Sequence, residues 1–130
     1  MGILSVLVAA AAGYAFGALW YMSLSKPWVE ASGAKSDENR RPEGSSPLPF
    51  ILSAIAMILV AGMMRHTFAL SGIETLGKGL VSGMGIGLFF ISPWIMINNA
   101  YGMRPFKLTI IDSGYAVIGC AIMGAVLGVF

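Results

Sequence analysis

The sequence is poor in charge, and this shortage limits what the protein can be. Only 11% of its 130 residues are Asp, Glu, Lys or Arg, against about 25% in typical soluble domains, while 57% are hydrophobic. A water-soluble chain of this length needs more polar residues to cover its surface. A lipid bilayer removes that need, because the outside of the protein can then be as apolar as its core. The composition therefore predicts a membrane protein.

Other absences exclude several function classes. The single cysteine, Cys120, rules out an intrachain disulfide, and there is no Cys-x-x-Cys or His-Glu-x-x-His motif, so we predict no metal site and no cofactor. The net charge is +2 without a dense basic patch, which argues against nucleic acid as a partner. No catalytic constellation is visible, because His66 and Asp112 are expected near opposite membrane faces. An enzyme is therefore not expected.

Four apolar runs are each long enough to cross a bilayer as a helix, which takes about 20 residues. They predict transmembrane helices at about 2–24, 48–70, 79–101 and 108–130. The runs are apolar all round rather than alternating, which excludes barrel strands. Short second and third links imply one domain over residues 1–130, an all-α membrane protein built as a four-helix up-and-down bundle. The first run lacks a basic leader, so we expect it to stay as a membrane helix. Pro93 should kink the third helix or leave a carbonyl unpaired.

The distribution of Lys and Arg predicts the orientation. Segment 25–47 and the link before the fourth helix together contain six Lys or Arg residues, whereas the second link contains two and the termini contain none. We therefore expect loop 25–47 in the cytoplasm and both termini in the periplasm of a cell inner membrane. Arg65 and His66 would then anchor the second helix at the outer surface.

Glycines recur at four-residue spacing in three of the predicted helices. They are Gly13 and Gly17, then Gly79, Gly83 and Gly87, and finally Gly124 and Gly128. This spacing places small residues along one helix face, where a second backbone can approach closely. The faces serve either packing within one chain or association between chains as a homo-oligomer.

Asp112 is the most informative polar residue, because a carboxylate inside a membrane helix is costly and needs partners. It lies about one turn inside the fourth helix, on the side predicted to be cytoplasmic. The polar and aromatic residues expected at the same depth are Trp20, Tyr21, Trp28, Asn98, Asn99, Arg104 and Tyr115. Such a group either anchors the helix ends or forms a small-ligand or proton site that opens inward.

Two segments resemble a known family. Gly17-Ala18-Leu19-Trp20-Tyr21-Met22-Ser23 followed by Lys26-Pro27-Trp28 is similar to the first-helix signature of a bacterial membrane family called domain of unknown function 1761. Asp112-Ser113-Gly114-Tyr115 is similar to its second signature. The resemblance implies a four-helix inner-membrane protein without an assigned activity or substrate.

Two functions of different class follow from these patterns. The first is a structural or accessory bundle that associates with itself or with a larger membrane complex, as the glycine faces suggest. The second is a small oligomeric transporter or channel with an inward-facing polar site around Asp112. Multidrug exporters of this size would be expected to have a carboxylate in the first helix, and none is present here.

Overall fold

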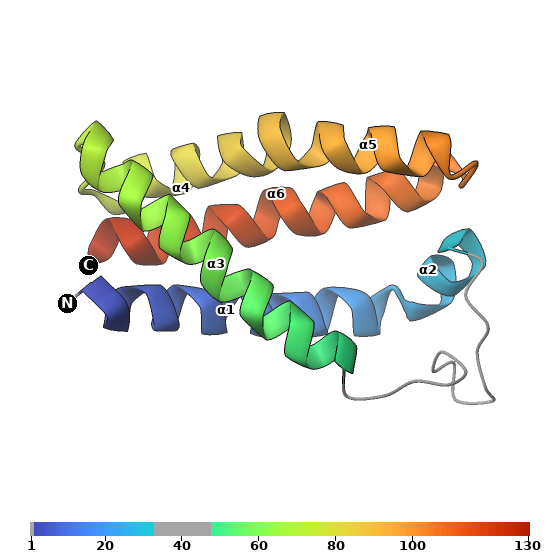
Figure 1. The fold of residues 1–130 in the computed structure, drawn as a ribbon, viewed down its shortest axis with the longest axis horizontal. Coiled ribbons are helices and arrows are strands. Elements are labelled where there is room, and N and C mark those ends of the chain that lie inside the picture. Colours follow the sequence, from blue (N-terminus) through green and yellow to red (C-terminus); the bar gives the residue numbers. More distant parts are fainter. Residues whose placement is uncertain (1, 33–47) are drawn as a thin grey trace.

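The computed structural model describes residues 2–32 and 48–130. Four helices in this part of the chain are long and apolar enough to cross a membrane. They are α1 (Gly2–Ser23), α3 (Leu48–Ser71), the third span Leu76–Tyr101, and α6 (Phe106–Val129). The helices alternate in direction, so Gly2 and Phe130 lie at the same end of the molecule (Figure 1). The expected all-α, four-helix, up-and-down membrane fold is confirmed.

The two ends of the molecule differ in structure. The terminal end contains both termini and the link between α3 and the third span, while the α2 end contains the short helix α2 (Ser25–Ser32) and the turn before α6 (Figure 1). Sequence analysis assigns residues 25–32 to a loop, whereas the structure makes them helical. Pro27 fits this helix because proline is tolerated in a first turn. The rest of the predicted loop, residues 33–47, lies outside the described residues.

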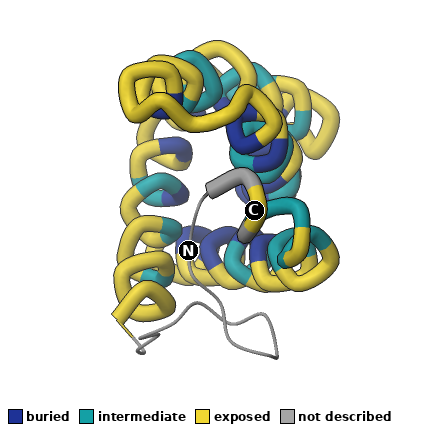
Figure 2. The backbone as a smooth tube through the Cα atoms, turned by 90° about the vertical axis from the view of Figure 1, so that its right-hand side faces the viewer, coloured by how far each residue is buried: buried dark blue, intermediate teal, exposed yellow. Residues whose placement is uncertain are grey.

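The helices pack in the order α3, α1, α6, third span. Helix α6 packs against α1 and against the third span, whereas α3 packs mainly against α1 and crosses it obliquely (Figure 1). The two central helices are the more buried ones. The buried share of the apolar window is 44% in α6 and 33% in α1, but 11% in α3 and 11% in the third span. Exposed residues, yellow in Figure 2, lie on the outward faces of the bundle, and buried residues, dark blue, lie where the helices face one another. In a bilayer, these outer surfaces face lipid or another protein.

Glycines bring α6 and the third span into backbone contact. The first part of the third span is α4 (Leu76–Ile86). A Cβ atom built on Gly79 would overlap the carbonyl oxygen of Gly124, and one on Gly83 would overlap that of Cys120. A Cβ atom on Gly128 would likewise overlap the carbonyl oxygen of Thr75, the residue just before α4. The third span and α6 are therefore held by close backbone packing, the arrangement that small residues permit in membranes.

A π-helical turn interrupts the third span just before Pro93. This turn, η1 (Gly87–Ile91), separates α4 from α5 (Ser92–Tyr101), and Pro93 occupies the first turn of α5. The carbonyl of Gly87 accepts two hydrogen bonds from Ser92. One comes from the backbone N–H and the other from the hydroxyl, whose oxygen lies 2.7 Å away. A local π-turn is one way in which a membrane helix accommodates the missing N–H of proline.

Candidate functional site

Asp112 lies half-buried near the α2 end, six residues into α6, and three side chains act on it. The hydroxyl of Tyr21 donates a hydrogen bond to its Oδ1 at 2.7 Å. The side chain of Trp28 forms a second hydrogen bond, and Arg104 attracts the carboxylate electrostatically. Six residues of helix correspond to about 9 Å along the axis, so the carboxylate lies in the outer part of the span and not at its centre. Its desolvation cost there is below the roughly 2.5–3.5 kcal/mol expected at the membrane centre.

Helix α2 positions Trp28 beside this carboxylate. Helical hydrogen bonds continue from α1 into α2. The N–H of Leu24 donates to the carbonyl of Trp20 at 3.0 Å, and the N–H of Trp28 donates to the carbonyl of Leu24 at 2.9 Å. Helix α2 then packs against α6, and the Trp28 ring meets the Tyr21 ring edge-on at 6.2 Å between centroids. The turn of the chain after α1 is thus what brings Trp28 close to Asp112.

A series of ring contacts extends from Tyr21, the hydrogen-bond partner of the carboxylate, to other residues of α1 and α6. Tyr115 meets Tyr21 edge-on at 5.4 Å, and Phe16 lies 6.1 Å from Tyr115 and 5.7 Å from Trp20. We call the six half-buried side chains the Asp112 cluster: Phe16, Trp20, Tyr21, Trp28, Asp112 and Tyr115. The cluster joins α1, α2 and α6 at the α2 end.

Glycines on the facing helices make room for the rings of the cluster. A Cβ atom on Gly17 would lie 2.8 Å from the Tyr115 hydroxyl, and one on Gly114 would lie 2.7 Å from the Trp20 ring. The Trp20 indole N–H donates to the carbonyl of Ile111 at 2.9 Å. Gly13 and Gly17 of α1 therefore face side chains of α6, in contrast to the backbone contacts of the glycines in α4.

Tyr115 also reaches α3, the outermost helix. Its hydroxyl lies 3.3 Å from the Met57 sulfur and 3.4 Å from the carbonyl of Gly13. The distance to the carbonyl is long for an O–H···O hydrogen bond, and a thioether sulfur is a weak acceptor, so both contacts are weak. They nevertheless link the cluster to α3, the second of the four spans along the chain.

Two of the residues expected beside Asp112 form no contact with it in the structure, and a third lies at the edge of the cluster. Asn99 is buried, but its Nδ2 donates to Thr109 Oγ1 at 3.2 Å, between α5 and α6. Asn98 is exposed on the outer side of α5, and Arg104 is exposed in the turn before α6. Of the predicted polar group, the structure therefore gathers Trp20, Tyr21, Trp28 and Tyr115 around Asp112, with Arg104 at its edge.

Sequence reasoning did not identify two residues that form contacts at the α2 end, Thr109 and Phe16. Thr109 lies in an apolar run, where a hydroxyl is easily overlooked, although its position three residues before Asp112 places both on one side of α6. Phe16 belongs to a long apolar run without polar neighbours. Its spacing of four residues from Trp20 is the signal that could have indicated a shared helix face.

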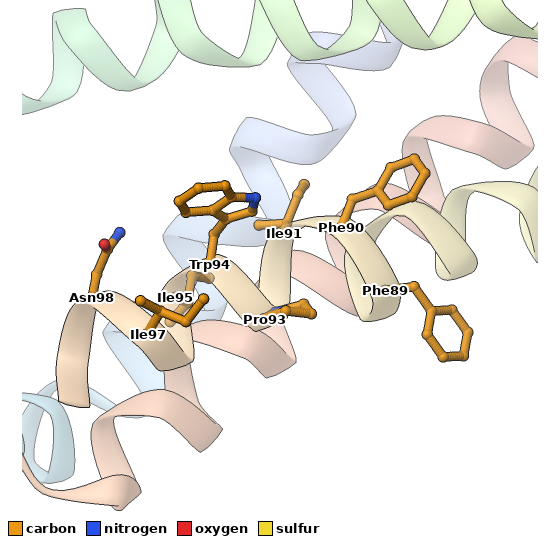
Figure 3. Close-up of a pocket in the computed structure, with 8 residues that line it drawn as sticks. All are labelled: Phe89, Phe90, Ile91, Pro93, Trp94, Ile95, Ile97 and Asn98. Atoms are coloured by element: carbon orange, nitrogen blue, oxygen red, sulfur yellow. The ribbon is translucent and has the colours of Figure 1, made fainter. Parts of the chain in front are cut away.

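The third span carries a shallow apolar groove. Its lining consists of Phe89, Phe90, Ile91, Pro93, Trp94, Ile95, Ile97 and Asn98. Figure 3 shows Phe90, Trp94 and Asn98, which are spaced by four residues, projecting from the same side of the helix. One polar group in an otherwise apolar lining fits contact with acyl chains better than chemistry on a polar substrate.

A smaller polar contact lies at the terminal end. Nε of Arg65 donates to Ser5 Oγ at 3.1 Å, and the Ser5 hydroxyl donates to the carbonyl of Gly2 at 2.8 Å. His66 is exposed. This contact ties α3 to α1 at the end away from Asp112.

The side chains offer little for metal or thiol chemistry. In residues 2–32 and 48–130, no three His, Cys, Asp or Glu side chains gather as a metal site would require. Cys120 is a free, buried thiol in the hydrophobic core, and its backbone carbonyl contacts α4. Its surroundings are those of a small packing residue.

Comparison with known proteins identifies a family but no characterised relative. No curated protein and no solved structure matches the chain. The sequence profile of one family, described as protein of unknown function (DUF1761), matches residues 4–128. That range includes all four spans and every residue of the Asp112 cluster. The chain therefore belongs to the DUF1761 family.

Proposed function

We propose that this chain is a structural or accessory protein of a bacterial inner membrane, and that it associates with itself or with a larger membrane complex. The observation that supports this most is the uneven burial of its spans. The four have nearly equal mean hydropathy, between 1.8 and 2.0, yet the share of each apolar window that is buried ranges from 44% in α6 to 11% in α3 and in the third span. Two apolar spans are thus left to contact lipid or other proteins.

Large side chains on both outer spans support an association surface. Leu59 on α3 is 68% exposed, and Phe90 and Trp94 on the third span are 69% and 67% exposed. Aromatic residues are enriched where membrane and protein interfaces need large contact areas. Within the described residues, the buried polar side chains are Ser5, Asn99 and Thr109, which do not line a continuous polar path. This favours association over conduction through a single chain.

Cross-linking in native membranes tests the proposal. Leu59→Cys and Phe90→Cys, each in a Cys120→Ala background, should form cross-links to a second copy or to another protein. Leu19→Cys provides the matched control, because Leu19 is equally exposed at 66% but lies on α1. A chain that forms no cross-link at either outer position and purifies in mild detergent as a monomer would overturn the proposal.

A second candidate function is a small oligomeric transporter or channel with an inward-facing polar site around Asp112. It is favoured by the fact that Asp112 is the one carboxylate in the four spans. Proton-coupled flux in liposomes that disappears in Asp112→Asn would support it. Flux that persists in this variant, or that is absent at every pH, would eliminate it.

The proposal of an inner-membrane protein includes the orientation of the chain in the membrane. The excess of Lys and Arg in segment 25–47 and in the turn before α6 supports a cytoplasmic α2 end and periplasmic termini. The Asp112 cluster would then face the cytoplasm.

A further inference from the structure

We propose that the Asp112 cluster binds an alkylammonium group at the membrane surface. This inference is independent of whether the chain associates with other proteins. It rests on three features of the cluster: a carboxylate that forms no ion pair within residues 2–32 and 48–130, aromatic rings that pack against its hydrogen-bond partners, and partial exposure of every member.

The first feature is the carboxylate of Asp112, which no cation contacts directly in the described parts of the chain. Its two hydrogen bonds come from Tyr21 and Trp28, and both donors are neutral. Arg104 attracts the carboxylate electrostatically, but no ion pair to Asp112 is formed in the described parts of the chain. A carboxylate has about four lone-pair positions, so two bonds leave it able to accept more. A charge at this depth gains stability from a cation in contact with it.

The second feature is the set of rings. Tyr21 forms edge-on contacts with both Trp28 and Tyr115, and Phe16 links Tyr115 to Trp20. The faces of Trp and Tyr rings attract cations, most strongly when water is partly excluded. Aromatic cages of such rings recognise quaternary ammonium groups, and a carboxylate beside the rings would add a direct charge contact.

The third feature is access. All six side chains are half-buried rather than sealed in the interior, and the carboxylate lies about 9 Å from the start of α6. A group at the headgroup level can therefore reach it. Hard metal cations are a poorer match, because they take several oxygen ligands and the cluster offers one carboxylate.

An alkylammonium group has two sources at this depth. One is the headgroup of an ethanolamine or choline lipid, and the other is a small organic cation from solution. Both present the same charge and similar size to the cluster, so the experiment has to separate them.

Tryptophan fluorescence of the full chain in lipid nanodiscs provides the assay. Two of the three tryptophans, Trp20 and Trp28, belong to the cluster, and the third is exposed on α5. The variant Trp94→Phe therefore confines the signal to the cluster. Titration with tetramethylammonium chloride in discs of phosphatidylglycerol, which has no ammonium headgroup, should give a saturable change that sodium chloride at equal ionic strength does not produce.

Two further variants test which groups bind the probe. Asp112→Asn keeps the shape and should weaken binding at least tenfold, while Trp28→Leu should weaken it severalfold by removing a ring. Protection of the Cys120 thiol from maleimide shows whether each variant is still folded. If Asp112→Asn unfolds, the effect of Trp28→Leu decides the test.

Discs that contain phosphatidylethanolamine separate the two sources. A lower apparent affinity for tetramethylammonium in these discs identifies the lipid headgroup as a competing occupant, whereas an unchanged affinity identifies a free cation. The proposal is overturned if phosphatidylglycerol discs show no saturable change, or if folded Asp112→Asn and Trp28→Leu bind the probe as the parent chain does.

Discussion

Replacing Gly83 by alanine would insert a methyl group between two helix backbones that are already in contact. The new Cβ would overlap the carbonyl oxygen of Cys120 and lie 3.2 Å from the Cα of Gly124. Both neighbours are backbone atoms, so relief requires the third span and α6 to move apart. Overpacking of this kind typically costs about 1–3 kcal/mol. We therefore expect Gly83→Ala to destabilise the contact by that amount.

Gly85→Ala is the matched control. Gly85 lies two residues away in the same helix, and a Cβ atom there would meet nothing within 4 Å. The same chemical change should leave the contact between α4 and α6 intact, and alanine favours a helix over glycine by about 1 kcal/mol. The pair of variants therefore separates crowding at the helix contact from helix propensity.

The native thiol reports the outcome. Cys120 is 3% exposed, and its backbone carbonyl is the group that the new Cβ would crowd, so loosening of this helix pair should expose the buried thiol to maleimide. A loss of 1–3 kcal/mol corresponds to labelling that is about 5- to 150-fold faster in Gly83→Ala than in the parent chain. Gly85→Ala should label at the parent rate or more slowly. Equal labelling rates in the two variants would refute the close backbone packing of α4 and α6.

Three other substitutions test separate contacts with the same labelling assay or with thermal unfolding in detergent. Thr109→Val leaves the buried amide of Asn99 without its acceptor and should cost about 1–3 kcal/mol, and unchanged stability would contradict this bond. Gly17→Ala crowds the Tyr115 ring, which as a side chain can rotate away, so its cost should be smaller than that of Gly83→Ala. Ser92→Ala removes a second hydrogen bond at the π-helical turn, where the backbone bond remains, and should cost at most about 1 kcal/mol.

The helices were predictable because the solvent dictates them. In lipid, each apolar run has to satisfy its own backbone, and a helix does so locally. The predicted first span of 2–24 and the observed Gly2–Ser23 nearly coincide for this reason. Helix α2 was not predictable in the same way, because Ser, Lys, Pro and Glu dominate it and its position depends on the contact of Trp28 with the end of α6.

The partners of individual residues depend on geometry that spacing alone does not contain. Gly83 and Gly85 belong to the same glycine-rich run, yet one faces α6 and the other meets no neighbour. Asn98 and Asn99 are adjacent, but a rotation of about 100° per residue exposes the first and buries the second. Sequence reasoning located the polar group near the helix ends. Which residues belong to that group depended on the rotation of each helix about its axis, which spacing does not give.

The packing order of the spans also goes beyond what connectivity predicts. A link of four residues joins α3 to the third span, and short links usually join neighbours. Here α3 packs along α1 instead. The close backbone packing between the third span and α6 explains this order, because the glycine face of α4 is already occupied by α6.

The central claim is that four helices cross the membrane in alternating directions, and the sidedness of two exposed turns tests it most directly. Ser71→Cys at the terminal end and Met103→Cys at the α2 end, each in a Cys120→Ala background, would be treated with a membrane-impermeant maleimide on sealed vesicles of known orientation. The account predicts that the two thiols react from opposite sides, with Met103→Cys labelled from the cytoplasmic side. Labelling of both from the same side would contradict it.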